Sequence, residues 1–398
     1  MSTAFFPRQI EIGPTCLVQL GEVASKLGGT HLLIVIDAFL VSSPYSYDER
    51  IKDIAKQHQL EVTFFSDYRG EPTTDHLSAA LNTMKGTGAD CVVAIGGGSA
   101  IDLAKAVSLF ALNPNIQWQE IASQTRLKKL PLIAVPTTAG TGSEATKIMV
   151  ITDSQTQFKM NPGHRDLIPD AAILDPELSC SLPKQFTAYT GMDALTHAIE
   201  AYVSTNANTI TDSYALLAIS KIANALPKVY ENGMDLEARE EMLMASCYAG
   251  IAFSNASTNL AHAAGRPLGA RFNIPHGLSV SLLLPFVMEF SLKAAEERFG
   301  DIAENLGIQE VECRSKLAES AVQHVNELNE HFDIWKDGFK YIDLVDLKES
   351  IPVLVEDALS GNGITTNRKV PDSKDVNELY LSLINKLKTI KECNTASL

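Results

Sequence analysis

The chain has 398 residues, more than one ordinary hydrophobic core supports, so its length predicts two domains. Hydrophobic residues make up 45% of it and charged residues 20%, which is typical of a globular protein and excludes a mainly disordered one. The formal net charge of −15 argues against nucleic-acid and anionic-membrane partners, because both would repel the chain.

The cysteines and the first residues indicate the compartment. Six cysteines are scattered without a CxxC pair, which favours reduced thiols over a disulfide framework or a zinc ribbon. The N-terminal stretch lacks the basic and apolar regions of a signal peptide, and no apolar window reaches the length of a membrane span. We therefore expect a cytoplasmic protein with no membrane partner.

The first part of the chain alternates short β-branched runs with amphipathic helical stretches. This alternation predicts an α/β domain with a mostly parallel, Rossmann-like sheet. In chain order we expect a strand at 31–37, a helix at 47–57, a strand at 60–65, a helix at 74–85, a strand at 90–95, a helix at 100–109 and a strand at 130–135.

The pattern changes near Leu182-Pro183, beyond which long helical stretches rich in Ala, Leu, Glu and Lys dominate. Helices are expected at 191–203, 211–226, 236–253 and 315–329. We place the boundary near residue 180, so that an α/β dinucleotide-binding domain (1–180) precedes an all-helical metal and substrate domain (181–398). A ligand site is expected in the cleft between the two domains.

A glycine-rich segment, Gly96-Gly97-Gly98-Ser99, follows a predicted strand and begins a predicted helix. Glycines there let the backbone approach a phosphate, and the free N–H groups of the helix start can bind it. The segment lacks the third glycine of the GxGxxG pattern, because Ile101 stands at that position. The alternative interpretation is a plain strand-to-helix turn.

Two further strand ends carry polar residues suited to a nucleotide. The segment 136–144 holds four hydroxyl side chains and two glycines after a strand, which is more than a simple connection needs. Asp37 ends an earlier strand, where a carboxylate suits the ribose hydroxyls of NAD and repels the 2′-phosphate of NADP. The alternative for Asp37 is an ordinary turn aspartate.

Four residues of the helical half form a candidate metal site. Asp193 and His197 are four positions apart on a predicted helix and therefore share one face. His262 stands in a small apolar stretch, and His276 lies between a proline and a glycine that predict a turn. One aspartate and three histidines suit a divalent ion and leave room for a substrate oxygen. The Asp193–His197 pair alone would indicate only a helix-packing contact.

Together these motifs resemble the iron-containing (group III) alcohol dehydrogenases, relatives of glycerol dehydrogenase and dehydroquinate synthase. The resemblance runs from the first strand to about residue 368 and so covers almost the whole chain. The residues that carry it are Gly96–Ser99 with Asp102 and Lys105, 136–144, 191–202, 253–256, His262, 267–269 and 275–277.

The resemblance implies an NAD-linked alcohol dehydrogenase or aldehyde reductase that acts on a small alcohol or aldehyde, and it suggests a homodimer or larger assembly. It implies Fe(II), or Zn(II) in some members, bound by Asp193, His197, His262 and His276. The residues that it implies for the cofactor are Asp37, Gly96, Gly97, Gly98, Ser99, Asp102, Thr137, Thr138, Thr141, Ser143 and Lys159. Phe253 and Arg266 are the candidate catalytic residues.

Two positions depart from the family pattern. Arg266 stands where the family usually has a second histidine one turn after the third ligand, and 70–73 reads Gly-Glu-Pro-Thr instead of Pro-Asn-Pro-Thr. We expect Arg266 to bind an anionic group, as in sulfoacetaldehyde or phosphonoacetaldehyde, since its guanidinium suits carboxylate, sulfonate or phosphonate. It could equally pair with a nearby carboxylate. Two other functions stay open: an inactive NAD-binding sensor, and a dehydroquinate synthase-like lyase.

Overall fold

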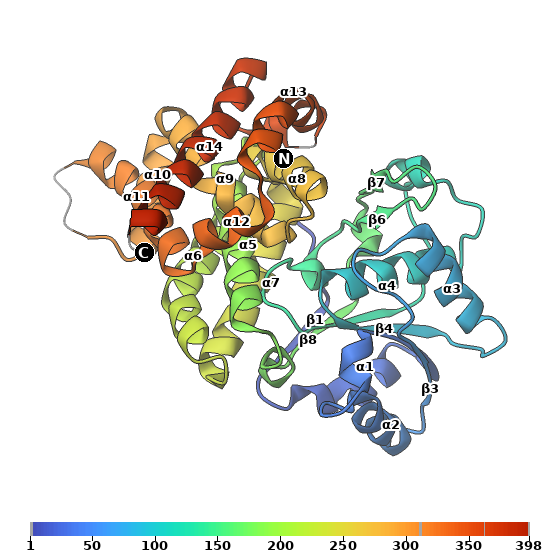
Figure 1. Cartoon of the computed structure of the whole chain (residues 1–398). Helices are drawn as coiled ribbons and strands as arrows, with labels where there is room; N and C mark the ends of the chain where they lie inside the picture. The colour runs from blue at the N-terminus through green and yellow to red at the C-terminus, as the bar shows by residue number, and fades with distance from the viewer. Residues whose placement is uncertain (1–2, 310–312, 362, 397–398) are drawn as a thin grey trace. The chain divides into compact units, whose positions relative to one another are not determined.

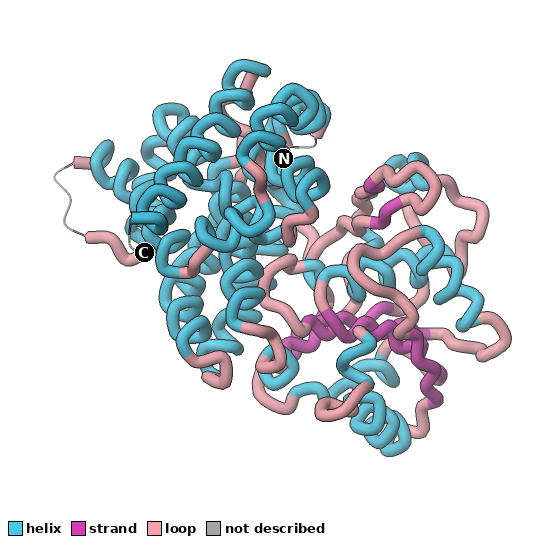
Figure 2. The backbone as a smooth tube through the Cα atoms, in the orientation of Figure 1, coloured by secondary structure: helices cyan, strands magenta, loops and turns pink. Residues whose placement is uncertain are grey.

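The computed structural model describes residues 3–309, 313–361 and 363–396. The chain divides into two compact units, which we call the sheet unit (Phe5–Leu182) and the helical unit (Pro183–Leu398, with Ala4). Figure 2 shows all strands in the sheet unit and helices throughout the other. The predicted fold class, an α/β half followed by a helical half, is confirmed.

The sheet unit is built on six parallel strands in the order β1-β8-β5-β4-β2-β3 (Figure 1). The strands are β1 (Gln9–Ile12), β2 (His31–Ile36), β3 (Glu61–Phe65), β4 (Cys91–Gly96), β5 (Leu132–Pro136) and β8 (Ala171–Leu174). A separate antiparallel pair is formed by β6 (Ile151–Thr152) and β7 (Lys159–Met160). The long helices are α1 (Leu20–Lys26), α2 (Tyr47–Gln57), α3 (Thr74–Met84) and α4 (Gly98–Phe110).

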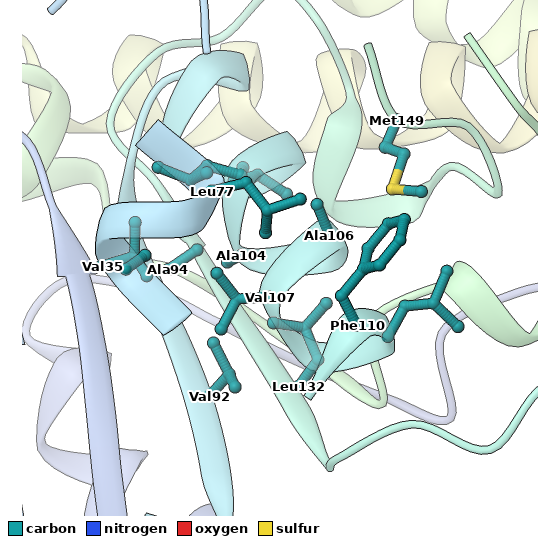
Figure 3. Packing of buried hydrophobic residues seen from close by; sticks show 14 of the residues in the cluster. Val35, Leu77, Val92, Ala94, Ala104, Ala106, Val107, Phe110, Leu132 and Met149 are labelled. Carbon is teal, nitrogen blue, oxygen red and sulfur yellow. The ribbon is translucent and has the colours of Figure 1, made fainter. Parts of the chain in front are cut away.

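Both faces of this sheet are buried. Val92 and Ala94 of β4 pack with Leu77 of α3 and Val107 of α4 (Figure 3), whereas Val93 and Ile95 pack on the opposite face with α1 and α2. Successive residues of a strand point to opposite faces, so a sheet covered on both sides needs continuous apolar runs. This explains why the strands could be recognised as unbroken hydrophobic segments.

The helical unit contains ten long helices and no strand within its described residues. They are α5 (Lys184–Val203), α6 (Thr209–Glu231), α7 (Leu236–Ala256), α8 (Leu260–Phe272), α9 (His276–Ser291), α10 (Glu296–Asn305), α11 (Arg314–His331), α12 (Ile334–Tyr341), α13 (Leu344–Ser360) and α14 (Ser373–Ala396). α5 is buried from Gly191 to Val203 and contacts α6, α7 and α9. It is therefore the central helix of this unit, and polar side chains on it face the interior.

The turn predicted around His276 is wrong. The chain turns earlier, at Asn273 (φ 52°), and His276 is the first residue of α9, with Pro275 at its N-cap. Gly277 is helical, and a Cβ atom there would lie 2.3 Å from the carbonyl oxygen of Tyr189 on α5. The glycine thus allows α9 to approach α5 closely, which brings His276 toward Asp193.

The expectation that no segment reaches membrane-span length also needs correction. The 19 residues His276–Ala294 have a mean hydropathy of 1.4 and are long and apolar enough to cross a membrane. However, 67% of their most apolar window is buried inside the protein. Burial of this kind is what a core helix shows, and it accounts for the apolar composition without a membrane.

Candidate metal centre and nucleotide-binding loops

Three helices of the helical unit bring the predicted metal ligands together. Asp193 and His197 lie one turn apart on α5, His262 lies in the first turn of α8, and His276 begins α9. α9 packs against both α5 and α8, so the three helices converge at this point. Asp193, His197 and His262 are buried, whereas His276 is exposed.

The distances among these side chains suit a single ion. Ligand atoms of Asp193, His262 and His276 all lie within 4.8 Å of one another. Asp193 Oδ1 is 3.5 Å from His262 Nε2 and 3.7 Å from His276 Nε2. Two ligands each about 2.1 Å from a tetrahedral ion are themselves about 3.4 Å apart. The observed spacing is close to that value, so these three residues fit one divalent ion.

His197 lies beside this group rather than within it. Its Nδ1 is 4.0 Å from Asp193 Oδ1. Its ring stacks on Phe253, with centroids 4.1 Å apart and planes at 14°, and on His262 at 4.3 Å and 23°. The structure therefore assembles three of the four predicted ligands and holds the fourth against them. Phe253 fixes the orientation of the His197 ring.

Two buried polar atoms at the centre of the site have no hydrogen-bond partner among the described residues. They are Asp193 Oδ1 and His262 Nε2, the two atoms that face each other at 3.5 Å. A buried polar atom without a partner costs on the order of 1–3 kcal/mol. An ion coordinated by both atoms would remove this cost, so the residues present fit a metal.

The charges of the site favour a cation as well. Burial alone would raise the pKa of Asp193, but the charges that His197, His276 and His262 can carry hold that pKa well below its ordinary value. Burial opposes protonation of His262, yet Glu200 and Asp193 raise its pKa overall. The Asp193 carboxylate thus stays ionised, and together with Glu200 it stabilises positive charge at this site.

Glu200 is a functional candidate that the sequence analysis missed. It lies on α5 three positions after His197, and its Oε2 is 2.6 Å from His262 Nδ1 while its Oε1 accepts the backbone N–H of Ala261 at 2.6 Å. Only 2% of its surface is exposed. An acid on the same helical face as Asp193 and His197, within an otherwise apolar stretch, was the available signal.

Arg266 lies one turn after His262 on α8. Within the described residues it makes no hydrogen bond and no ion pair, although Glu200 and Asp193 act on its charge. Burial lowers the pKa of Arg266, and those two carboxylates oppose the shift. Among the described residues, the structure thus leaves a partly buried guanidinium without a bonded partner close to the candidate metal ligands.

In the sheet unit, three neighbouring strands end in the predicted nucleotide residues. Asp37 follows β2, Gly97 and Gly98 follow β4, and the segment 137–144 follows β5. A Cβ atom on Gly98 would lie 2.8 Å from Thr141 Cγ2, so the two loops run side by side. Gly97 is the N-cap of α4, whose free N–H groups suit a phosphate.

Asp37 is held in place by two donors. Tyr68 donates its hydroxyl to Oδ1 at 2.7 Å, and the backbone N–H of Gly97 donates to Oδ2 at 3.2 Å. Burial raises the pKa of Asp37, and both hydrogen bonds oppose that rise. Each oxygen keeps a free lone pair, so the carboxylate can still accept hydroxyl groups of a ligand.

The predicted cofactor residues fall into two groups. Gly97, Gly98, Ser99, Thr138 and Thr141 are partly exposed, whereas Thr137, Ser143 and Gly96 are buried. Ser143 donates to Asp102, and both lie in a buried network around Lys105. Lys105 Nζ donates to Ser143 Oγ at 3.1 Å, Thr146 Oγ1 at 2.9 Å and the carbonyl of Ile148 at 2.6 Å. Asp102 and Ser143 thus connect α4 to the segment that follows β5.

Lys159, predicted to reach toward the cofactor, lies on β7 and forms an ion pair with Glu71. The two charged atoms are 2.6 Å apart, and 39% of the lysine side chain is exposed. Glu71 belongs to the Gly-Glu-Pro-Thr stretch that departs from the family pattern. Lys159 is therefore paired with a carboxylate from the stretch that differs from the family pattern.

Comparison with known proteins identifies the two halves of the chain with one family. Residues 7–176 match "Iron-containing alcohol dehydrogenase", and residues 187–384 match "Fe-containing alcohol dehydrogenase family, C-terminal". The chain is 42% identical over 321 residues to "Probable alcohol dehydrogenase EutG" of Escherichia coli strain K12, covering 79% of this chain and 78% of that protein.

Two further similarities extend over nearly the whole length. The "NAD-dependent methanol dehydrogenase" of Bacillus methanolicus is 36% identical over 382 residues, with 95% of this chain and 99% of that protein covered. The crystal structure of a sulfoacetaldehyde reductase from Bifidobacterium kashiwanohense in complex with NAD⁺ has a TM-score of 0.84 and 27% identity, with 96% of this chain and 99% of that chain covered.

We predict that a divalent ion stabilises the helical unit through Asp193. Zn(II) or Fe(II) at a hundred times its Kd should add about 2.7 kcal/mol to the free energy of unfolding, because only the folded protein assembles the ligands. Asp193→Asn should abolish most of this gain, which thermal unfolding with and without metal measures. Asp346→Asn, a change of a half-exposed acid in the same unit, serves as the control. A full metal response in Asp193→Asn would refute the site.

We also predict that Lys105 stabilises the sheet unit. Lys105→Met should lower the free energy of unfolding by about 3–5 kcal/mol, because it leaves the Asp102 carboxylate uncompensated. Adding Asp102→Asn should restore part of the loss. The matched control is Lys52→Met, whose exposed pair with Asp48 (2.8 Å) is worth about 1 kcal/mol or less. Equal losses in denaturant titrations of both methionine variants would contradict the assignment.

Proposed function

The chain belongs to the iron-containing alcohol dehydrogenase family, and we propose that its substrate is a small alcohol or aldehyde that carries an anionic group. Relatives of the chain are named as alcohol dehydrogenases, NAD-dependent in Bacillus methanolicus and NADPH-dependent in Clostridium saccharobutylicum, and this chain shares the reaction class of an NAD-linked alcohol oxidoreductase. The single observation that carries the finer proposal is the partly buried guanidinium of Arg266, which lies one turn from His262 and has no bonded partner among the described residues.

The candidate ligands would hold the ion, and each neighbour has a separate task. Asp193, His262 and His276 supply one oxygen and two nitrogen donors, a set that suits Fe(II) or Zn(II). A bound ion of this kind acts as a Lewis acid, which eases loss of the alcohol proton and polarises the aldehyde carbonyl in the reverse direction. His197 stands next to Asp193 as a fourth donor, with its ring held by Phe253.

The charges around the ion leave one positive charge unmatched. Asp193 and Glu200 carry one negative charge each and together match a divalent ion. Arg266 then adds a positive charge that no described residue pairs with. An isolated charge that is partly withdrawn from water is costly, so a substrate anion at this position would be favoured. The planar guanidinium can bind carboxylate, sulfonate or phosphonate through two parallel hydrogen bonds.

The similarity to a sulfoacetaldehyde reductase supports this proposal, because the name of that protein specifies an aldehyde with a sulfonate group. Other relatives carry the names of neutral alcohols, such as methanol in Bacillus methanolicus and 1,3-propanediol in Klebsiella pneumoniae. A neutral aldehyde is therefore the competing substrate class, and substitution of Arg266 distinguishes neutral from anionic substrates.

The cytoplasmic location and the homo-oligomeric state expected from the sequence stay predictions.

We predict that Arg266→Ala impairs turnover of anionic aldehydes selectively. Hydrogen bonds to a charged group contribute about 1.5–3 kcal/mol, so kcat/KM for sulfoacetaldehyde should fall roughly 10- to 150-fold. The value for acetaldehyde, which lacks the anion, should change little. Arg271→Ala is the control, since that arginine lies on the same helix but is more than half exposed and paired with Asp346. Equal losses on both aldehydes would contradict anion recognition.

We propose further that Asp37 selects NAD over NADP, since its carboxylate would repel a 2′-phosphate. Asp37→Asn should shift the ratio of the NADPH and NADH dissociation constants toward NADPH by about tenfold, or about 1.4 kcal/mol. Tyr68→Phe removes a hydrogen bond to the same carboxylate but leaves its charge, and it should keep the preference for NADH. Fluorescence titration with both cofactors measures the ratio, and an unchanged ratio in Asp37→Asn would exclude this role.

A further inference from the structure

We propose that Glu200 is a positioning residue that selects the tautomer of His262 able to bind the metal ion. The inference rests on the proposed metal centre and deepens it, because Glu200 does not itself face the ion. It assigns a role to a residue that lies behind the ligands, on the side of His262 away from Asp193.

The hydrogen-bond geometry at Glu200 leaves little freedom. Oε1 lies 2.6 Å from the backbone nitrogen of Ala261, which can only donate. Oε2 lies 2.6 Å from His262 Nδ1, and only 2% of the residue is exposed. An ionised carboxylate can only accept hydrogen bonds. Nδ1 of His262 must therefore carry the proton that it donates to Oε2.

The opposite ring nitrogen is then free to bind a cation. With the proton on Nδ1, a neutral imidazole has its lone pair on Nε2. That atom is buried, has no hydrogen-bond partner in the described part of the chain and faces Asp193 Oδ1 at 3.5 Å. In the other tautomer, the lone pair of Nδ1 would oppose the Glu200 oxygen at 2.6 Å, which is strongly repulsive. Glu200 thus prepares His262 before any ion arrives.

Glu200 also has a structural role that the test must separate. Its side chain satisfies an N–H group in the first turn of α8, where a negative charge is favoured. Its backbone carbonyl accepts the side-chain amide of Asn259, the N-cap of α8, at 2.7 Å. A residue of this kind could simply fasten α8 to α5. A purely structural role would change stability but would leave the proton position on His262 as it is.

Glu200→Gln distinguishes the two roles, because it keeps the size of the side chain. The Ala261 N–H still requires an acceptor, so the amide oxygen of glutamine should take that place and the NH₂ group should face His262 Nδ1. Nδ1 must then accept and Nε2 must carry the proton, which blocks the metal. Loss of such an outer partner weakens metal binding about 10- to 100-fold in other proteins, and we expect a loss in this range.

Two readouts on the full chain test the proposal. Zn(II) affinity is measured by competition with a chromophoric chelator. The histidine tautomers of the metal-free protein are read from ¹⁵N chemical shifts at a pH raised until the His262 ring is neutral, because its pKa lies above that of an ordinary imidazole. In the wild type we expect His262 with its proton on Nδ1, and in Glu200→Gln on Nε2. Tyr380→Phe is the control, since its buried hydroxyl donates to the Ala264 carbonyl of the same helix at 2.8 Å.

The outcomes separate this inference from the proposed function. A wild-type tautomer with the proton on Nε2 overturns the role of Glu200, whether or not the protein binds metal. Unchanged Zn(II) affinity in Glu200→Gln, or an equal loss in Tyr380→Phe, overturns it as well. If the tautomers behave as expected but the wild type binds neither Zn(II) nor Fe(II), the metal centre fails while the positioning of His262 stands.

Discussion

The burial of the Asp193 carboxylate in the middle of the helical unit is the constraint on which the site depends. α5 is buried along its second half, so an ionised side chain there must be compensated or it costs several kcal/mol. Compensation comes from imidazoles on α5, α8 and α9, which Gly277 allows to approach closely. These helices pack around one carboxylate, and the imidazoles that compensate its charge are also the candidate ligands of the metal ion.

The predicted nucleotide site of the sheet unit depends on its backbone rather than on a buried charge. Its nucleotide loops present backbone N–H groups and glycines, and its one buried lysine is turned away from any ligand. The ammonium group of Lys105 donates hydrogen bonds to two hydroxyls and a carbonyl, and its Nζ lies 3.6 Å from Asp102 Oδ1. Lys105 therefore joins α4 to the segment that follows β5. This connection fixes the position of α4, whose N-terminus is the predicted phosphate site.

Most of the fold and part of the site could be predicted from the sequence, for identifiable reasons. Long apolar periodicities and unbroken strand segments predict elements well, because burial dictates them. Glu200 was missed because the spacing of residues along α5 does not show that its carboxylate contacts His262 on α8. Gly277 was misread because glycine serves turns and close helix contacts alike. Asp102 and Ser143 were assigned to the cofactor by resemblance, whereas the structure shows them bonded to each other.

Arg266 and Glu200 are best understood together. A divalent ion held by the candidate ligands would repel the guanidinium of Arg266, which lies one helical turn after His262. Glu200 adds a negative charge from behind His262, where its two oxygens are bonded to His262 and to the backbone of Ala261. This charge and that of Asp193 match a divalent ion, so the guanidinium of Arg266 still requires an anion, which the proposed substrate would supply. A family histidine at position 266 would be neutral for most of the time and would place no such demand on the substrate.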